Sequence, residues 1–281
     1  MKFTKEHLEA YHRDGYVVVR NFFTHEEVDL LYNIAIDDDL MSKKSFDRTD
    51  ASGLKTKLAL WYSLDESLYS KFARSERIVD AVEQILNGKA AHYHSKLMQK
   101  EPKKGGAWEW HQDYGYWYKN QFLFPDQLVS IMIALTHANK ENGCLQVIKR
   151  SHKLGRVNHG FAGEQVGADM VMVDHALETL EHVYVDLQPG DALFFHSNLL
   201  HRSEANLSDH PRWSIISCYN SLSNHAFNDS STSWREPVHM VADAAMMAES
   251  IGGAAATADF LRKENDPALK ETGWEKEVKT T

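Results

Sequence analysis

The stretch from residue 91 to residue 220 constrains the fold most strongly, because it divides into short apolar runs that are separated by turn sequences. The runs that resemble strands lie at residues 91–99, 129–135, 144–148, 183–185, 192–196 and 213–219. Asn142-Gly143 and Pro189-Gly190-Asp191 supply turns before two of them. Helical segments do not alternate with these runs, as βαβ units would require. The pattern therefore predicts an antiparallel barrel or jelly roll.

The segments on either side of this core predict helices. We expect residues 1–90 to be mainly helical, with helices over residues 3–14, 24–35, 64–72 and 76–86 and a strand over residues 16–19. Thr24 and Glu27 fit a capping box at the start of the second helix.

Two polar segments and the C-terminal region complete the chain. Residues 42–57 predict a mobile loop and residues 153–181 an irregular insertion, and either segment is a candidate lid. Residues 221–281 predict an alanine-rich helix followed by a charged tail. We expect residues 1–281 to form a single catalytic domain, mainly β with helical decoration, in which residues 91–220 are the core.

Three residues of this core have the chemistry of a metal site. His111 and Asp113 are two residues apart, and in a strand over residues 108–113 both side chains would point to one face. His201 follows the apolar run over residues 192–195 and offers a third ligand. Two histidines and one carboxylate that leave other positions open are typical of non-haem Fe(II) oxygenases. Arg212, eleven residues after His201, is a candidate clamp for the carboxylate of an organic cosubstrate.

Two other functions are compatible with the same triad. Zinc with three protein ligands and a water could catalyse hydrolysis, although a hydrolase has no use for Arg212 as an oxoacid clamp. A barrel that has lost its activity could serve as a cupin-like binding module, although all three ligand types are present. His92 and His94 also share a face, but with no acid beside them we interpret both as ordinary strand histidines.

Bulk properties exclude several classes of function. The net charge of −9 argues against binding to nucleic acid or to an anionic membrane. The N-terminus has no apolar signal segment, and no apolar run approaches the roughly 18 residues that span a bilayer. The two cysteines form no C-x-x-C pair. Motifs of P-loop, Rossmann, G-x-S-x-G and H-E-x-x-H proteins are also missing. We expect a cytoplasmic enzyme with a small-molecule substrate, and the sequence leaves its oligomeric state open.

The substrate contacts are less determined. Tyr114, Tyr116, Trp117 and Tyr118 follow the first two ligands and could form a substrate wall, enclose a cation, or simply pack in the core. Arg150 could meet an anionic substrate, with an exposed loop as the alternative. These residues suggest a small or medium-sized metabolite without identifying it.

Taken together in order, several motifs resemble the phytanoyl-CoA dioxygenase (PhyH) family over roughly residues 4–220. They are Tyr11–Val18, His111-Gln112-Asp113, Glu141–Val147, Ser151-His152-Lys153, Pro189-Gly190-Asp191, and His201 with Arg212. The resemblance implies a double-stranded β-helix (a cupin-like jelly roll) that uses Fe(II), 2-oxoglutarate and O2.

The resemblance also implies roles for individual residues. His111, Asp113 and His201 match the iron ligands, and Arg212 matches the residue that pairs with the distal carboxylate of 2-oxoglutarate. Gln112 and Ser203 match positions that contact the cosubstrate, and Ser214 completes an Arg-x-Ser pair that resembles one in other 2-oxoglutarate enzymes. Met98 and Gln99 lie on the strand that lines the same pocket in the family. Related halogenases replace the metal carboxylate by a small residue, so the presence of Asp113 favours hydroxylation.

Overall fold

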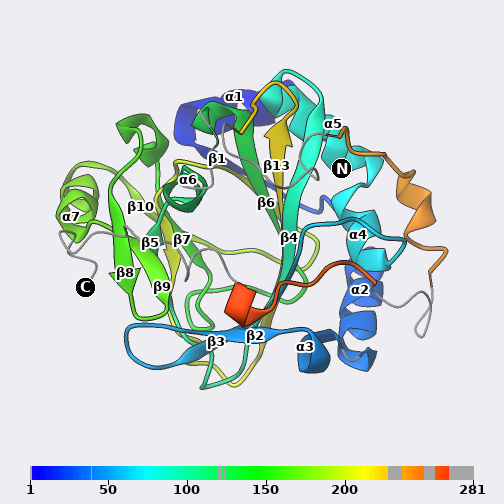
Figure 1. Ribbon diagram of the computed structural model, residues 1–281, viewed down its shortest axis with the longest axis horizontal. Helices are drawn as coiled ribbons and strands as arrows, with labels where there is room; N and C mark the ends of the chain where they lie inside the picture. Colours follow the sequence, from blue (N-terminus) through cyan, green and yellow to red (C-terminus); the bar gives the residue numbers. More distant parts are fainter. Residues whose placement is uncertain are drawn as a thin grey trace.

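The computed structural model describes residues 2–38, 40–118, 122, 124–226, 236–249 and 257–265. Two antiparallel β-sheets enclose the interior of the protein (Figure 1). The larger sheet has the strand order β1-β11-β6-β13-β4-β3-β2, and the smaller has the order β10-β7-β12-β5. The predicted jelly roll, mainly β with helical decoration, is therefore confirmed.

The strands of the larger sheet are β1 (Tyr16–Val19), β2 (Phe46–Thr49), β3 (Lys55–Trp61), β4 (Ala90–Lys100), β6 (Leu128–Ala134), β11 (Ala192–His196) and β13 (Arg212–Ser221). Those of the smaller sheet are β5 (Trp108–His111), β7 (Leu145–Ile148), β10 (His182–Val185) and β12 (His201–Ser203). A separate hairpin consists of β8 (His159–Ala162) and β9 (Gln165–Ala168). The α-helices are α1 (Lys5–Asp14), α2 (His25–Asp37), α3 (Leu40–Lys43), α4 (Leu68–Ala73), α5 (Glu76–Leu86), α6 (Asp113–Trp117) and α7 (Met170–Thr179).

The two faces of the larger sheet have different partners because side chains alternate along each strand. On the outer face, Leu97 and Ile215 join one apolar cluster with helix residues such as Val28 and Ile78. On the inner face, Met98, Ile216 and Phe195 share a second cluster with Val147 of the smaller sheet. The metal-site residues described below lie within the space between the two sheets, away from the helices α2, α4 and α5.

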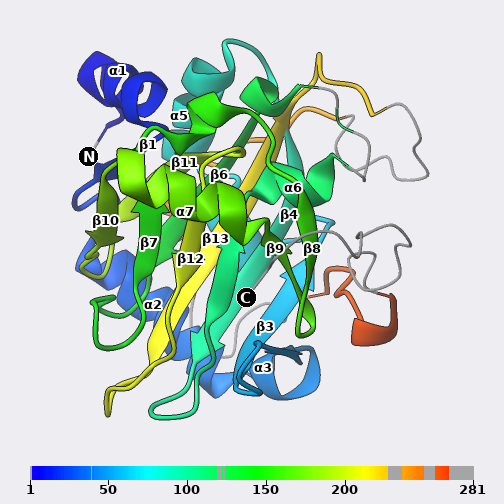
Figure 2. The same cartoon turned by 90° about the vertical axis from the view of Figure 1, so that its left-hand side faces the viewer.

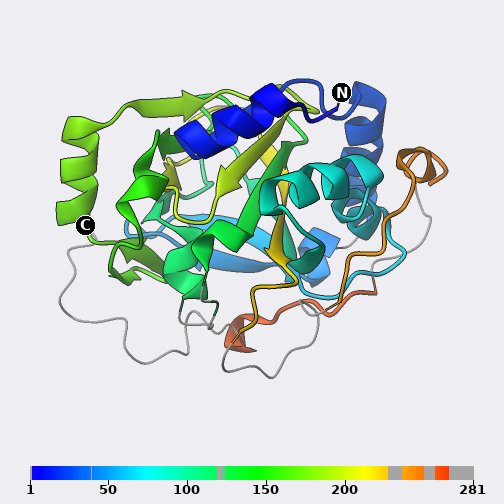
Figure 3. The ribbon, with the colours of Figure 1, turned by 90° about the horizontal axis from the view of Figure 1, so that it is seen from above.

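Local signals in the sequence explain several helix ends. The predicted capping box is present, since Thr24 and Glu27 bond to each other's backbone amides at the start of α2. Gly15 ends α1 with a φ of 84°, a left-handed conformation that glycine adopts without strain. Helix α1 lies across one end of the sheets and faces the viewer in Figure 3.

Two segments that were expected to be irregular are ordered, and both predictions were wrong. Residues 42–57 contain β2 and most of the β2–β3 hairpin, which extends the larger sheet beyond β4, so the first ninety residues hold more strand than expected. Residues 153–181 contain the β8–β9 hairpin and α7, which covers the smaller sheet (Figure 2). Polar residues form these elements because one face of each remains in solvent while the other packs on a neighbour.

The C-terminal region also differs from expectation. The described residues 236–249 hold a single short 3-10 helix, Asp243–Ala245, and residues 257–265 hold another, Lys263–Asn265. The predicted alanine-rich helix is therefore absent from these two segments, and the rest of the region lies outside the described residues. Within the described part of the chain, no helix combines the length and the apolar character needed to cross a membrane.

Candidate metal centre

The predicted metal ligands come from two neighbouring strands and the start of one helix. His111 on β5 pairs directly with His201 on β12, so their side chains emerge side by side. Asp113 does not continue β5 as predicted, because it is the first residue of α6. Gln112 makes the bend, and the Tyr114 amide anchors the new helix to the Ser197 carbonyl at 2.9 Å.

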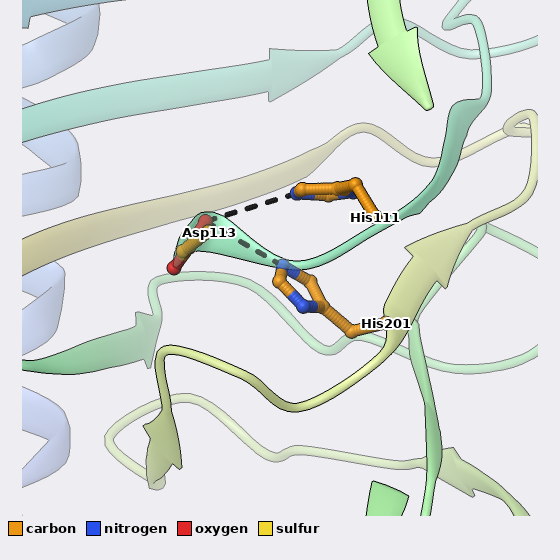
Figure 4. Close-up of side chains that lie close together, drawn as sticks. All are labelled: His111, Asp113 and His201. Atoms are coloured by element: carbon orange, nitrogen blue, oxygen red, sulfur yellow. Dashed lines mark ion pairs between the residues drawn. The ribbon is translucent and has the colours of Figure 1, made fainter. Parts of the chain in front are cut away.

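The three ligand atoms nevertheless lie within 4.8 Å of one another (Figure 4). Asp113 Oδ1 lies 3.8 Å from His111 Nε2 and 3.8 Å from His201 Nε2. Two donors that each bind one ion at about 2.1 Å can lie up to about 4.2 Å apart, so a single ion can hold both pairs. All three side chains are buried. The donor set therefore fits a divalent metal of the Fe(II) type with open positions.

Backbone carbonyls orient the two imidazoles. His111 Nδ1 donates to the Glu109 carbonyl at 2.7 Å, and His201 Nδ1 donates to the Leu199 carbonyl at 2.9 Å. Each bond leaves Nε2 unprotonated and directed at Asp113. Burial lowers the pKa of both histidines, and for His111 the neighbouring His201 lowers it further. Both imidazoles are therefore neutral at physiological pH, which metal binding requires.

Ser130 holds the second oxygen of the carboxylate ligand. Ser130 Oγ, which is fully buried on β6, donates to Asp113 Oδ2 at 2.6 Å. Cys218 Sγ contacts the same Oγ at 3.3 Å, and burial raises the pKa of Cys218 to about 12, so it remains a thiol. The bond to Ser130 turns Asp113 Oδ1 toward the histidines. The sequence did not mark Ser130, which is one serine within an apolar strand.

A buried cationic pair lies at the start of β13. Arg212 pairs across the sheet with Lys100 of β4, and both side chains are almost fully buried. Lys100 Nζ donates to Ser203 Oγ at 2.8 Å, and Arg212 donates to the Gly143 carbonyl. Burial and then the Arg212 charge hold the pKa of Lys100 well below its usual range, and burial lowers the pKa of Arg212 to about 10.

This pair has the character of an anion site. Among the residues that the structure describes, neither Lys100 nor Arg212 forms an ion pair with a carboxylate. Arg212 Nε and Ser214 Oγ are buried without any hydrogen-bond partner. Buried polar atoms in proteins are normally bonded, so unpaired atoms beside two cations fit a carboxylate ligand. The sequence missed Lys100 because the predicted strand ended at residue 99, whereas Lys100 is the last residue of β4.

The side chains of the other residues that were predicted to contact the cosubstrate point in different directions. Met98 shares the inner face of β4 with Lys100. Gln99 points the opposite way, into a surface cavity of about 870 Å³ that also contains Trp213. Gln112 Nε2 donates to the Gly155 and Asn198 carbonyls, and its Oε1 accepts from the Val157 amide. Neither arrangement supports the predicted cosubstrate contact, since the Gln99 side chain faces away from the metal ligands and the Gln112 side chain is occupied by backbone bonds.

The four aromatic residues that follow Asp113 also differ in what their side chains contact. Tyr114 donates to the Phe122 carbonyl at 2.9 Å, and Trp117 packs edge-on against Tyr93. Tyr116 is the member that touches the metal site, with its ring 5.7 Å from that of His111. The remaining tyrosine, Tyr118, is about half exposed.

The remaining predicted residues lie elsewhere or pack in the core. Arg150 is exposed and its amide bonds to the Asp14 carbonyl, so the alternative of an exposed position holds. His92 bonds to the Tyr62 carbonyl and to Ser95, as expected for a strand histidine.

Gly115 in α6 has no room for a side chain, since an added Cβ would lie 2.2 Å from His159 Nε2.

Comparisons with known proteins identify one family and several relatives. The family model described as phytanoyl-CoA dioxygenase (PhyH) matches residues 11–214. The ectoine dioxygenase of Bordetella parapertussis is 23% identical over 240 residues, which cover 78% of this chain and 76% of that protein. The L-proline trans-4-hydroxylase of Streptomyces griseoviridis is 28% identical over 176 residues, which cover 57% of this chain and 65% of that protein.

Solved structures share the same fold. The iron-bound structure of EctD from S. alaskensis superimposes with a TM-score of 0.67 at 19% identity, and the match covers 85% of this chain and 88% of that one. The 2-oxoglutarate-dependent carbocyclase SnoK from nogalamycin biosynthesis also has a TM-score of 0.67 at 19% identity, over 85% of this chain and 93% of that one.

Proposed function

The chain belongs to the phytanoyl-CoA dioxygenase (PhyH) family of Fe(II)- and 2-oxoglutarate-dependent dioxygenases, and on that premise we propose that it hydroxylates a C–H bond of a small metabolite. The observation that carries the proposal is the buried convergence of His111, Asp113 and His201 beside an anion site with two cations. An oxygenase of this type needs both features, because the metal and the oxoacid act together.

We assign Arg212 and Lys100 to the distal carboxylate of 2-oxoglutarate. Both side chains are already desolvated, so an arriving carboxylate meets fixed charges that lose little solvation on binding. The unpartnered Ser214 Oγ would donate a further hydrogen bond, and Ser203 would hold the Lys100 ammonium in place. A zinc hydrolase has no use for such a site, and this favours the oxygenase over the alternatives.

When bound, iron supplies the oxidising chemistry: 2-oxoglutarate loses CO2 to give succinate, and one atom of O2 enters the substrate. The chain contributes position and shielding. The inner apolar cluster, which includes Met98, Leu145 and Phe195, excludes water from this space. Tyr116, whose ring stands against His111, limits where a substrate can lie.

The substrate is proposed only as a class. The relatives named above carry the names of ectoine and L-proline, which are both small carboxylic acids. We propose a substrate of similar size, because the three metal ligands are buried between the two sheets.

Succinate release in the presence of Fe(II), 2-oxoglutarate and O2 tests the proposal. We expect wild-type protein to release succinate slowly without substrate and to show the charge-transfer absorption of an Fe(II)–2-oxoglutarate chelate under anaerobic conditions. Asp113→Ala should abolish both signals. A wild-type protein that gives neither signal with iron, yet hydrolyses esters or amides with zinc, would contradict the oxygenase assignment.

A further inference from the structure

Lys96 is a charged residue on the inner face of the larger sheet that the proposed reaction does not yet use. It lies on β4 two residues before Met98 and four before Lys100, so all three side chains point to the same face. Its neighbours across the sheet are Leu60 and Ile216. The position is thus about 13 Å along the strand from the cationic pair that we assign to 2-oxoglutarate.

The Trp108 ring connects the Lys96 ammonium to the first metal ligand, His111. Lys96 Nζ is 5.8 Å from the centre of the Trp108 ring, and that ring is 6.3 Å from the ring of His111. The ammonium therefore lies on the metal side of the sheet and not on its outer surface.

Lys96 lacks the carboxylate partner that several other partly buried cations have. Arg77 pairs with Glu27 at 2.7 Å, and Lys263 pairs with Glu164 at 2.8 Å. Within the described segments of the chain, Lys96 forms neither an ion pair nor a hydrogen bond, and its contact is the face of an indole ring. A partly desolvated ammonium without an anion is costly unless a ligand completes it.

A second positive charge lies on the same side of the sheet. Arg48 on β2 is buried and donates to the Glu164 carbonyl at 2.6 Å. Its guanidinium interacts electrostatically with the Tyr116, Glu164 and Tyr62 side chains. The Glu164 carboxylate is itself paired with Lys263, and Asp113 is committed to Ser130 and the histidines, so Lys96 and Arg48 are left as the charges that an incoming ligand meets. A cationic substrate would be repelled here, and an anionic one attracted.

We propose that Lys96 binds the carboxylate of the primary substrate and thereby selects small carboxylic acids. The inference rests on the proposed function, because it takes the space beside His111, Asp113 and His201 as the place of reaction. Trp108 supports the ammonium from one side and leaves its remaining N–H groups for the ligand. One charged contact near the metal would also fix which C–H bond faces the iron.

Three variants test this assignment. Lys96→Met removes the charge with little change in length, and Lys96→Arg keeps the charge. Lys57→Met is a matched control, because Lys57 lies on the adjacent strand and pairs on the sheet surface with Glu101. Each protein is titrated with 2-oxoglutarate under anaerobic conditions by the charge-transfer absorption. Succinate release is then measured with a panel of short amino and hydroxy acids, L-proline among them, each beside its neutral amide.

In wild-type protein and in Lys57→Met, acids should stimulate succinate release more than their amides do. Lys96→Met should raise the KM for the acids roughly 10- to 100-fold, as expected when one hydrogen bond to a charged group is lost. It should leave the dissociation constant for 2-oxoglutarate within twofold of wild type, and Lys96→Arg should recover most of the acid preference.

Two results would overturn the proposal. If wild-type protein responds to amides as well as to acids, or to neither, carboxylate selection is wrong. If Lys96→Met weakens 2-oxoglutarate binding instead, Lys96 serves the cosubstrate. Both outcomes leave the Fe(II)–2-oxoglutarate absorption of the wild type intact, whereas failure of the proposed function would remove it.

Discussion

Replacing Ser130 by alanine should weaken iron binding without unfolding the protein. Ser130 Oγ donates to Asp113 Oδ2 at 2.6 Å, and both side chains are buried. In Ser130→Ala, Asp113 Oδ2 loses the hydrogen bond from Ser130 Oγ, and water has little access to replace this donor because the site is buried. Asp113 is then free to rotate away from the orientation in which Oδ1 faces His111 and His201.

The size of the effect follows from the kind of bond that is lost. Removing an outer hydrogen bond to a metal ligand typically costs 10- to 100-fold in metal affinity, or about 1.4–2.7 kcal/mol. The missing oxygen atom leaves a small void whose packing cost is below that range. We therefore expect the dissociation constant for Fe(II) to rise about 10- to 100-fold, with a smaller loss in unfolding free energy of the metal-free protein.

The assay is an anaerobic Fe(II) titration at saturating 2-oxoglutarate, followed by the charge-transfer absorption. Ser95→Ala is the matched control, because Ser95 is also fully buried in the larger sheet and bonds to His92 and Ser217 away from the metal. Chemical denaturation of both metal-free variants measures the generic cost of removing a buried hydroxyl.

The result that would refute this reasoning is specific. If Ser130→Ala binds Fe(II) as tightly as wild-type protein does, the hydrogen bond does not orient Asp113. If Ser130→Ala and Ser95→Ala lose the same amount of iron affinity, the cause is a general loosening of the sheet instead.

Three further predictions concern the cosubstrate, the packing of α6 and the response to pH. Arg212→Ala should raise the 2-oxoglutarate concentration needed for half-maximal turnover by at least tenfold, because a two-pronged charged contact is lost; an unchanged requirement, measured by succinate release, would remove the assigned role. Gly115→Ala should lower the melting temperature, because its Cβ would overlap the His159 ring, and a calorimetric scan equal to wild type would contradict this. Burial lowers the pKa of His92 to about 4, so the folded state resists protonation of this side chain. Its contribution to stability is present above pH 6.5 and is lost as the pH falls toward 4, by up to about 1.4 kcal/mol per pH unit. Urea unfolding at pH 7 and pH 5 should show a smaller difference in His92→Gln than in wild type.

Residue chemistry and spacing were enough to predict the core. The alternation of short apolar runs with turns indicates an antiparallel jelly roll. Strands of this kind form sheets, and a sheet buries its apolar face by packing against a second sheet. His111, Asp113 and His201 stood out because few combinations of residues can ligate one metal. Their convergence survived a wrong local prediction, since Asp113 reaches the site from a helix and not from a strand.

The tertiary structure alone decided which residues surround that site. Lys100 is opposite Arg212, and Ser130 is beside Asp113, only because the strand registers bring them there. A shift of one residue would turn each side chain to the other face. Because β4 and β13 are largely buried on both faces, no alternation of polar and apolar residues specifies their register. Strand pairing also determines that Gln99 faces outward. The polar residues 42–57 form a hairpin because β3 pairs with β4, which lies far away in the sequence.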